Sequence, residues 1–260
     1  MNRQGRLIPS MTAAGASHMA IDSWMLDQLI DDNQPPILRF YRWSTASISL
    51  GYHQKQWPQH WQHLTWQSQT VELVRRPTGG RAVLHQGDLT YAIVLPLVGK
   101  RQDAYQQICN ALISAWQRLE VPLDYGTAGH SYRYQDNCFA LSTPADLVTA
   151  SGEKLIGSAQ LRRDRYLLQH GSIQLWPEPT LYQQVFGTDA MPPQHRPSTI
   201  PAQPHDQFLE TLEELIQAEL MRSLQIEFTP QPLSPLEQTE IAARSARFAI
   251  PVDSSPKQAT

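Results

Sequence analysis

The 260-residue chain lacks the features typical of a membrane protein, a disulfide-rich secreted domain or a zinc protein. Its longest central apolar run, residues 91–98, is far short of the roughly 18 residues that a membrane span needs. No apolar block of signal-peptide length occurs near the N-terminus. The only two cysteines, Cys109 and Cys138, are too few for a disulfide framework, and their separation matches no zinc-ligand spacing. We therefore expect a cytoplasmic protein with two free thiols, no bound metal and no membrane contact.

The chain also lacks a large excess of charge of either sign. A net charge of −3 gives no general attraction to nucleic acid, so electrostatic recognition must come from a local patch. Arg162, Arg163 and Arg165 form the densest basic cluster, which either is a solvated face or docks an acidic partner protein. The hydrophobic content of 41% at this length can bury a substantial core. One large domain, or one domain with a small lobe, is expected.

Residues 71–96 (VELVRRPTGGRAVLHQGDLTYAIVLP) hold the most distinctive pattern in the chain. Apolar residues recur at every second position from Leu89 to Leu95, as in a half-buried strand. Before that strand, Gly79 and Gly80 leave backbone N–H groups unobstructed. Arginines surround this turn at positions Arg75, Arg76 and Arg81. The pattern predicts a strand, a loop suited to a large, partly anionic ligand, and a second strand; the alternative is a surface turn with solvated arginines.

Helices and strands are predicted along the rest of the chain from hydrophobic period and end signals. The helices are expected at residues 17–31, 103–119, 206–224 and 235–247, and the strands at 37–43, 46–50, 146–149, 153–156, 166–169 and 226–228. Ser234, Pro235 and Glu237 have the features of a capping box. A domain over residues 17–250 is expected to contain a proline-rich loop at 176–207, between a flexible segment at 1–16 and a disordered tail at 251–260.

The two cysteines lie in different settings. Cys109 is on the apolar side of the predicted helix at residues 103–119, which indicates a core residue. Cys138 follows an irregular segment, residues 125–137, that contains His130 and Arg133. From these residues alone, Cys138 is either a packed thiol or a thiolate within reach of a substrate.

Lys154 begins a predicted strand and is followed by small residues at Gly157, Ser158 and Ala159. Small residues let a ligand approach the backbone. A lysine beside such a site can donate to an oxyanion, or exchange protons if burial lowers its pKa. The alternative is a solvated lysine in a hairpin.

Four segments together resemble the catalytic domain shared by lipoate-protein ligases, biotin ligases and octanoyl transferases. They are LRFYRWSTASISLGYHQ (38–54), RRPTGGRAVLH (75–85), GEKLIGSAQ (152–160) and LQHGSI (168–173). The resemblance implies an α/β (α+β) fold: a mixed β-sheet flanked by helices on one side, with or without a small second sheet. It also implies a tunnel for a medium-chain acyl group, with the arginine-glycine loop and the lysine segment facing each other across it.

Departures from the ligase pattern favour one branch of this family. Ligases usually have three consecutive glycines in the loop, whereas Arg81 follows Gly79 and Gly80 here. The pair Cys138-Phe139, sixteen residues before Lys154, resembles cysteine-dependent octanoyl-[acyl carrier protein]:protein N-octanoyltransferases. The first alternative is an ATP-dependent lipoate-protein ligase, which forms a lipoyl-adenylate. The second is a catalytically silent module that binds an acyl group or cofactor.

The resemblance also implies substrates and residue roles. An octanoyl or lipoyl group would pass from acyl carrier protein through a Cys138 thioester to a lysine of a lipoyl domain or glycine cleavage H protein. No cofactor is required, whereas the ligase alternative needs ATP and Mg. Lys154 would act as a cation or, like His85, take the acceptor's proton, and His170 would orient a strand end. The implied substrate-binding residues are Arg75, Arg76, Gly79, Gly80, Arg81, His85, Gly157, Ser158, Ala159 and His170. A monomer is expected.

Overall fold

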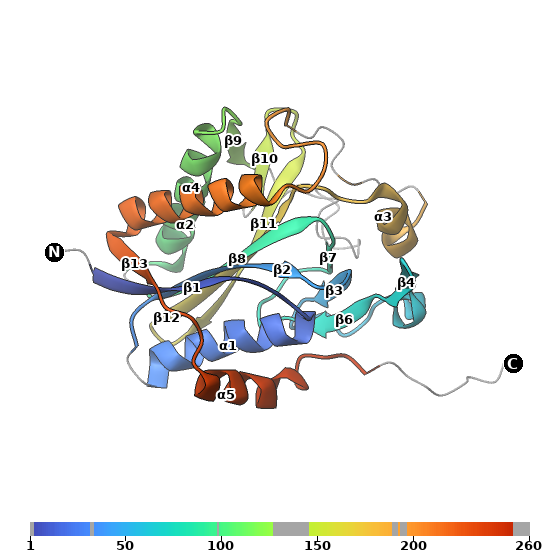
Figure 1. Cartoon of the computed structure of the whole chain (residues 1–260), viewed down its shortest axis with the longest axis horizontal. Coiled ribbons are helices and arrows are strands. Elements are labelled where there is room, and N and C mark those ends of the chain that lie inside the picture. The colour runs from blue at the N-terminus through green and yellow to red at the C-terminus, as the bar shows by residue number, and fades with distance from the viewer. Residues whose placement is uncertain are drawn as a thin grey trace, which may run out of the picture.

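The computed structural model describes residues 3–31, 34–97, 99–126, 146–188, 192 and 197–251. A mixed eight-stranded sheet crosses the molecule in the order β13-β1-β2-β8-β12-β11-β10-β9 (Figure 1). Its strands are β1 (Arg3–Ala13), β2 (Ile37–Trp43), β8 (Asp88–Pro96), β9 (Leu123–Tyr125), β10 (Asp146–Thr149), β11 (Lys154–Arg163), β12 (Tyr166–Gln174) and β13 (Ile226–Pro230). The first three strands in this order are parallel, and the remaining pairs are antiparallel.

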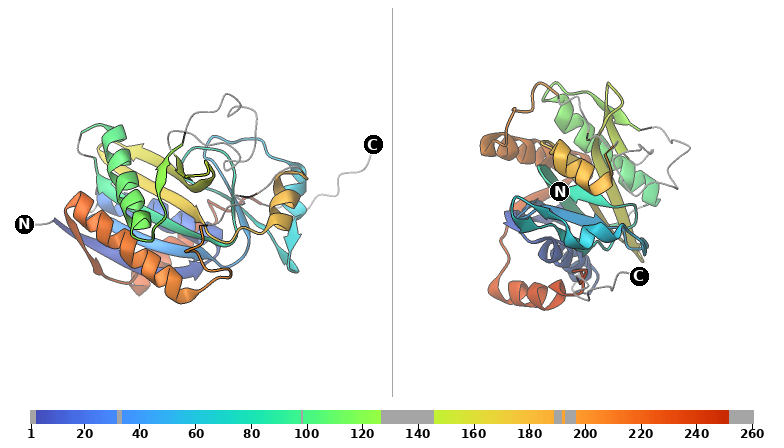
Figure 2. Two further views of the ribbon diagram at one scale, coloured as in Figure 1. Left: turned by 90° about the horizontal axis from the view of Figure 1, so that it is seen from above. Right: turned by 90° about the vertical axis from the view of Figure 1, so that its right-hand side faces the viewer.

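Helices cover both faces of the main sheet (Figures 1 and 2). On one face lie α2 (Arg101–Gln117) and α4 (Asp206–Leu224), and on the other α1 (Gly15–Asp31) and α5 (Pro235–Ser245). Strand β8 shows why: Tyr91 and Ile93 pack toward α2 and α4, whereas Ala92 and Val94 pack toward α1. The predicted period of this strand is confirmed. The expectation of helices on one side only is wrong, because a strand that is apolar on both faces needs cover on both.

A second, three-stranded sheet has the order β6-β3-β7. Its strands are β3 (Ser47–Leu50), β6 (Glu72–Arg75) and β7 (Val83–His85). The two strands predicted on either side of the glycine loop are β6 and β8, which belong to different sheets. In the small sheet, β3 lies between β6 and β7. Strand period reports which face is buried but not which strand is the neighbour. The expected fold class, a mixed sheet flanked by helices with a small second sheet, is confirmed.

The N-terminal segment is the clearest correction. Residues 3–13 form β1, paired in parallel with β13 and β2, and the helix α1 begins at Gly15. Arg6 on β1 donates to both carboxylate oxygens of Glu237, at 2.6 and 2.9 Å. The prediction of a flexible segment at residues 1–16 is wrong because the partners that hold it are distant in sequence.

The proline-rich segment also contains regular structure. The helix α3 (Pro179–Phe186) packs against the small sheet through Leu181, Tyr182 and Val185. Its proline occupies the first turn, where the missing N–H costs no helical hydrogen bond. Smaller elements are a 3-10 helix (Gln59–His63) and the hairpin of β4 (Thr65–Trp66) and β5 (Gln69–Thr70).

Several local predictions are confirmed. The helix α4 has the predicted bounds, and Ser234 and Glu237 form the predicted capping box of α5. Within the described ranges, no helix is long and apolar enough to cross a membrane. Of the predicted disordered tail at residues 251–260, all but residue 251 lies outside the described residues.

Candidate active site

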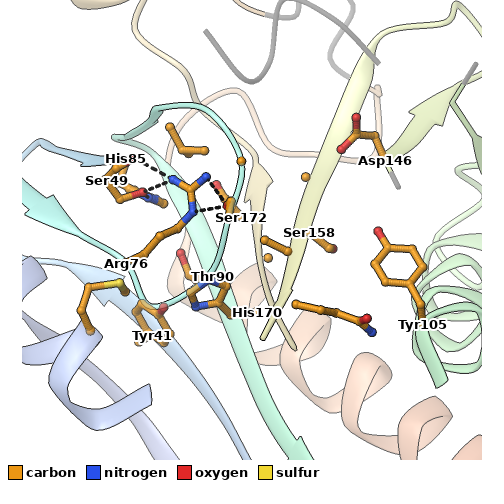
Figure 3. Close-up of a pocket in the computed structure, with 18 of the residues that line it drawn as sticks. Tyr41, Ser49, Arg76, His85, Thr90, Tyr105, Asp146, Ser158, His170 and Ser172 are labelled. Carbon is orange, nitrogen blue, oxygen red and sulfur yellow. Dashed lines mark hydrogen bonds between the residues drawn. The ribbon is translucent and has the colours of Figure 1, made fainter. Parts of the chain in front are cut away.

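A cavity of about 540 Å³ lies between the small sheet and the main sheet (Figure 3). Its lining includes Gly79 and Gly80 of the glycine loop and Gly157, Ser158 and Ala159 of β11, so the fold brings these two segments to one site. Ser49, Arg76 and His85 lie at one end, and Tyr105 and Asp146 lie at the other. Met19 of α1 and Tyr41 of β2 also line it. The volume is within the usual range for small-molecule sites.

The Arg76 guanidinium holds the glycine loop in shape. It donates to the carbonyl oxygens of Ser49 at 2.7 Å, Gly79 at 2.8 Å and Arg81 at 2.6 Å. The loop also needs glycine at Gly51, where an added Cβ would lie 1.9 Å from the Gly80 carbonyl oxygen. Because Arg76 is buried, the alternative of a surface turn with solvated arginines is wrong at this position.

Three other predicted residues surround the cavity without appearing in its lining. Arg75 donates to the carbonyl oxygens of Gly51 at 2.9 Å and Gln54 at 2.7 Å, so it braces the segment after β3. Arg81 contributes its carbonyl oxygen to Arg76. Lys154 Nζ lies 2.9 Å from Oδ1 of Asp146, which itself lines the cavity. Lys154 is buried, so the alternative of a solvated hairpin lysine is also wrong.

The structure describes only one of the two cysteines, Cys109. Cys138 lies outside the described residues, together with its sequence neighbours His130 and Arg133. Cys109, a residue of α2, is fully buried in the core, and burial raises the pKa of its thiol to about 12. A thiol with that pKa is almost entirely protonated at neutral pH, so Cys109 is a packing residue, as predicted.

The first of two buried polar groups at the site, here called the floor cluster, comprises Asp22, Arg39, Tyr41, His170 and Thr78. Asp22 accepts from Arg39 Nε at 3.0 Å, from Tyr41 at 3.0 Å and from His170 Nδ1 at 2.8 Å. His170 Nε2 lies 2.6 Å from the Thr78 hydroxyl, next to the glycine loop. Burial alone would raise the pKa of Asp22, but Arg39 and the hydrogen bonds outweigh it and lower that pKa. His170 therefore joins β12 to the loop.

The second group, here called the wall cluster, comprises Ser49, His85 and Asp88. Ser49 Oγ lies 2.8 Å from His85 Nε2, and His85 Nδ1 lies 2.8 Å from Asp88 Oδ2. Trp43 stacks on the imidazole with ring centroids 3.7 Å apart. Burial lowers the pKa of His85, and the attraction of Asp88 only partly opposes that shift.

Sequence reasoning missed Ser49, Asp88, Asp22 and Asp146. The only available signals were local: Ser49 lies within one of the four resembling segments, and Asp88 follows His85 by three residues. Neither spacing indicates that Ser49 and Asp88 meet the same imidazole. Register pairing in the small sheet, Ser47 opposite His85 and Ser49 opposite Val83, brings Ser49 to the imidazole, whereas Asp88 comes from β8 of the main sheet.

Comparison with known sequences places the chain in a family. The model of the lipoyl protein ligase A/B catalytic domain matches residues 14–228. The chain therefore belongs to this family, as the four sequence segments suggested.

Within this family, the chain is similar to proteins named octanoyltransferase. Octanoyltransferase LipM of Carboxydothermus hydrogenoformans is 39% identical over 173 residues, 65% of this chain and 64% of that protein. Octanoyltransferase LipM of Clostridioides difficile is 35% identical over 180 residues, 66% of each chain. The matched region thus spans less than two thirds of the length of these relatives.

Solved structures of similar fold are more distant in sequence. A bi-partite lipoate protein ligase of Thermoplasma acidophilum has a TM-score of 0.68 and 18% identity, and covers 94% of this chain and 93% of its own. A lipoate-protein ligase A bound with ATP has a TM-score of 0.71 and 18% identity, and covers 94% of this chain and 95% of its own. At these identities the similarity supports the fold alone.

Proposed function

We propose that this protein is an octanoyltransferase, which moves an octanoyl or lipoyl group from acyl carrier protein to a lysine of a lipoyl-accepting protein. Membership of the lipoyl ligase family and the relatives named octanoyltransferase support this reaction class. The observation that carries the proposal is the cavity that joins the glycine loop to the β11 segment beside Lys154. The apolar side chains of Met19 and Val83 in the lining suit an acyl chain, and the acceptor would be a lipoyl domain or glycine cleavage H protein.

In the proposed chemistry, the Cys138 thiolate attacks the thioester carbonyl and takes the acyl group. A free thiol has a pKa near 8.5, so a neighbouring cation is needed to favour the thiolate. Lys154 is the proposed cation, because Asp146 at 2.9 Å favours its charged form. An ammonium held in this way also polarises a carbonyl oxygen. The donor thioester is already activated, so the reaction needs no ATP, Mg or other cofactor.

The remaining residues are proposed to hold the acyl donor. Gly79 and Gly80 on one side, and Gly157, Ser158 and Ala159 on the other, let the ligand approach the backbone closely. Arg76 keeps the glycine loop in place, with Arg75 and Arg81 as supports. His170 orients β12 and the loop through Thr78.

The decisive test is incubation with octanoyl-acyl carrier protein without ATP. We expect a hydroxylamine-sensitive octanoyl adduct on Cys138, measured by peptide mass spectrometry, followed by transfer to a lipoyl domain. Cys138→Ala removes the adduct, whereas Cys109→Ser, the matched control, keeps it. An adduct that persists in Cys138→Ala contradicts the proposal. Transfer that requires ATP, Mg and the free acid indicates the ligase alternative, and a bound acyl ligand with neither activity indicates a silent binding module.

A further inference from the structure

The wall cluster has the order and geometry of a proton relay that begins at the cavity. A carboxylate only accepts hydrogen bonds, so His85 Nδ1 carries the ring proton that is donated to Asp88. The other nitrogen, Nε2, is then an acceptor, and the Ser49 hydroxyl donates to it. Ser49 and His85 line the cavity (Figure 3), whereas Asp88 is absent from its lining and contacts the other ring nitrogen of His85.

The Ser49 oxygen can accept a hydrogen bond from a ligand. A hydroxyl oxygen has two lone pairs. One accepts from Arg76 Nη1 at 3.3 Å, and the hydroxyl proton is directed to His85. Among the described residues, these are the side-chain hydrogen bonds of Ser49 Oγ, which leaves one lone pair for an N–H donor in the cavity. The Arg76 charge also stabilises negative charge on this oxygen.

The imidazole is held from three sides. Trp43 stacks on its face and donates through Nε1 to Thr90 at 3.0 Å. Thr90 and Ser172 both donate to the same Asp88 oxygen that accepts from His85, at 3.1 and 2.6 Å. Asp88 is therefore fixed where it stabilises an imidazolium. Burial, Arg76 and His170 lower the pKa of His85 against the pull of Asp88, so the resting ring is neutral and ready to accept a proton.

Lys154 is poorly suited to the same task. A base must be uncharged before it accepts a proton, but Asp146 at 2.9 Å favours the ammonium form of Lys154. The structure thus separates the two roles: Lys154 pairs with Asp146, which lies at one end of the cavity, and the neutral His85 imidazole lies near Arg76 at the other (Figure 3).

We propose that Ser49, His85 and Asp88 take the proton of the acceptor amine, an inference that rests on the proposed function. The acceptor lysine arrives as an ammonium, and one of its N–H protons passes to Ser49 Oγ as the hydroxyl proton of Ser49 passes to His85 Nε2. The uncharged amine nitrogen then bonds to the carbonyl carbon of the Cys138 thioester, and the C–S bond breaks. The second N–H proton goes to the leaving sulfur, and the imidazolium beside Asp88 returns its proton to water. Ser49 contacts the amine, and His85 and Asp88 act through it.

The test compares two nucleophiles on the same acyl-enzyme. Full-length protein is loaded with octanoyl-acyl carrier protein, and single-turnover loss of the Cys138 adduct is followed with a lipoyl domain or with hydroxylamine. Hydroxylamine is already uncharged at neutral pH and depends less on a base than lysine does. In His85→Asn, whose amide N–H can still donate to Asp88, we expect normal loading and transfer to lysine that is about 100-fold slower or more. Cleavage by hydroxylamine stays near the wild-type rate.

A second variant and a matched control complete the test. Ser49→Ala is expected to show the same selective loss, and it covers the case in which His85→Asn does not fold. Ser47→Ala is the control: Ser47 is also buried on β3, but its hydroxyl donates to the Thr45 carbonyl at 3.0 Å. Wild-type transfer to lysine in His85→Asn or Ser49→Ala, or an equal loss for both nucleophiles, overturns the relay. No Cys138 adduct in the wild-type protein contradicts the proposed function, and the relay with it, before any variant is compared.

Discussion

The floor cluster and the wall cluster flank the same cavity but hold their protons and charges differently. In the floor cluster, the ion pair of Asp22 and Arg39 is fully buried, and His170 has partners on both ring nitrogens. In the wall cluster, the His85 ring is neutral and the Ser49 oxygen keeps a lone pair toward the cavity. A closed ion-paired network fixes geometry, whereas a neutral imidazole between a carboxylate and a hydroxyl that faces the cavity can move a proton. Burial alone does not distinguish the two.

The largest expected effect comes from opening the floor cluster. Asp22→Ala leaves the Arg39 guanidinium buried without its carboxylate, which we expect to lower the free energy of unfolding by about 3–5 kcal/mol. Asp27→Ala on the same helix is the matched control, because its partners Arg163 and Arg244 are partly exposed, and a loss of about 1 kcal/mol or less is expected. Urea denaturation measures both. Equal losses would show that the floor cluster is no more important for stability than a surface ion pair.

The next largest effect is the pH dependence of the free energy of unfolding that His18 causes. Burial, assisted by the Arg39 charge, lowers the pKa of His18 to about 3 from 6.5. Between these values the unfolded chain binds a proton that the folded protein does not. Stability from this group is therefore complete above pH 6.5 and lost as the pH falls toward 3, by up to about 1.4 kcal/mol per pH unit.

The matching variant is His18→Asn. We expect its free energy of unfolding, measured in urea at each pH, to depend less on pH than that of the wild-type protein between pH 6.5 and 4. Parallel curves for the two proteins would contradict a neutral, buried His18.

The smallest expected effect concerns the wall cluster. Ser172→Ala removes one donor from Asp88, but Thr90 and His85 still donate to the same oxygen. We expect a loss of about 1 kcal/mol in the free energy of unfolding. Ser10→Ala, which removes an exposed hydrogen bond to Glu213, is the control and should change stability by about 0.5 kcal/mol or less. A loss in Ser172→Ala as large as in Asp22→Ala would remove the contrast between the clusters.

Local pattern predicted much of the fold and little of the site's connectivity. The α4 helix and the alternation in β8 follow from side-chain period, which depends only on neighbours in sequence. By contrast, β1 pairs with β13, more than 200 residues away, so the local sequence of residues 3–13 predicted a flexible segment and gave no sign of this strand. The strands on either side of the glycine loop, β6 and β8, are close in sequence but lie in different sheets. The partner of β6 is β3, which precedes it by more than 20 residues, so the local pattern did not indicate this pairing.

By itself the sequence determined the fold class, the family and the segments that meet at the cavity, because each has a local motif. It named Arg76, Gly79, Gly80 and His85 from one loop and Gly157, Ser158, Ala159 and His170 from two strands, and these line the cavity. Only the tertiary structure decided which groups meet: Asp146 with Lys154, Asp22 with His170, and Ser49 and Asp88 with His85. Such contacts depend on strand register and sheet order, which bring together residues whose spacing in the chain carries no sign of their proximity.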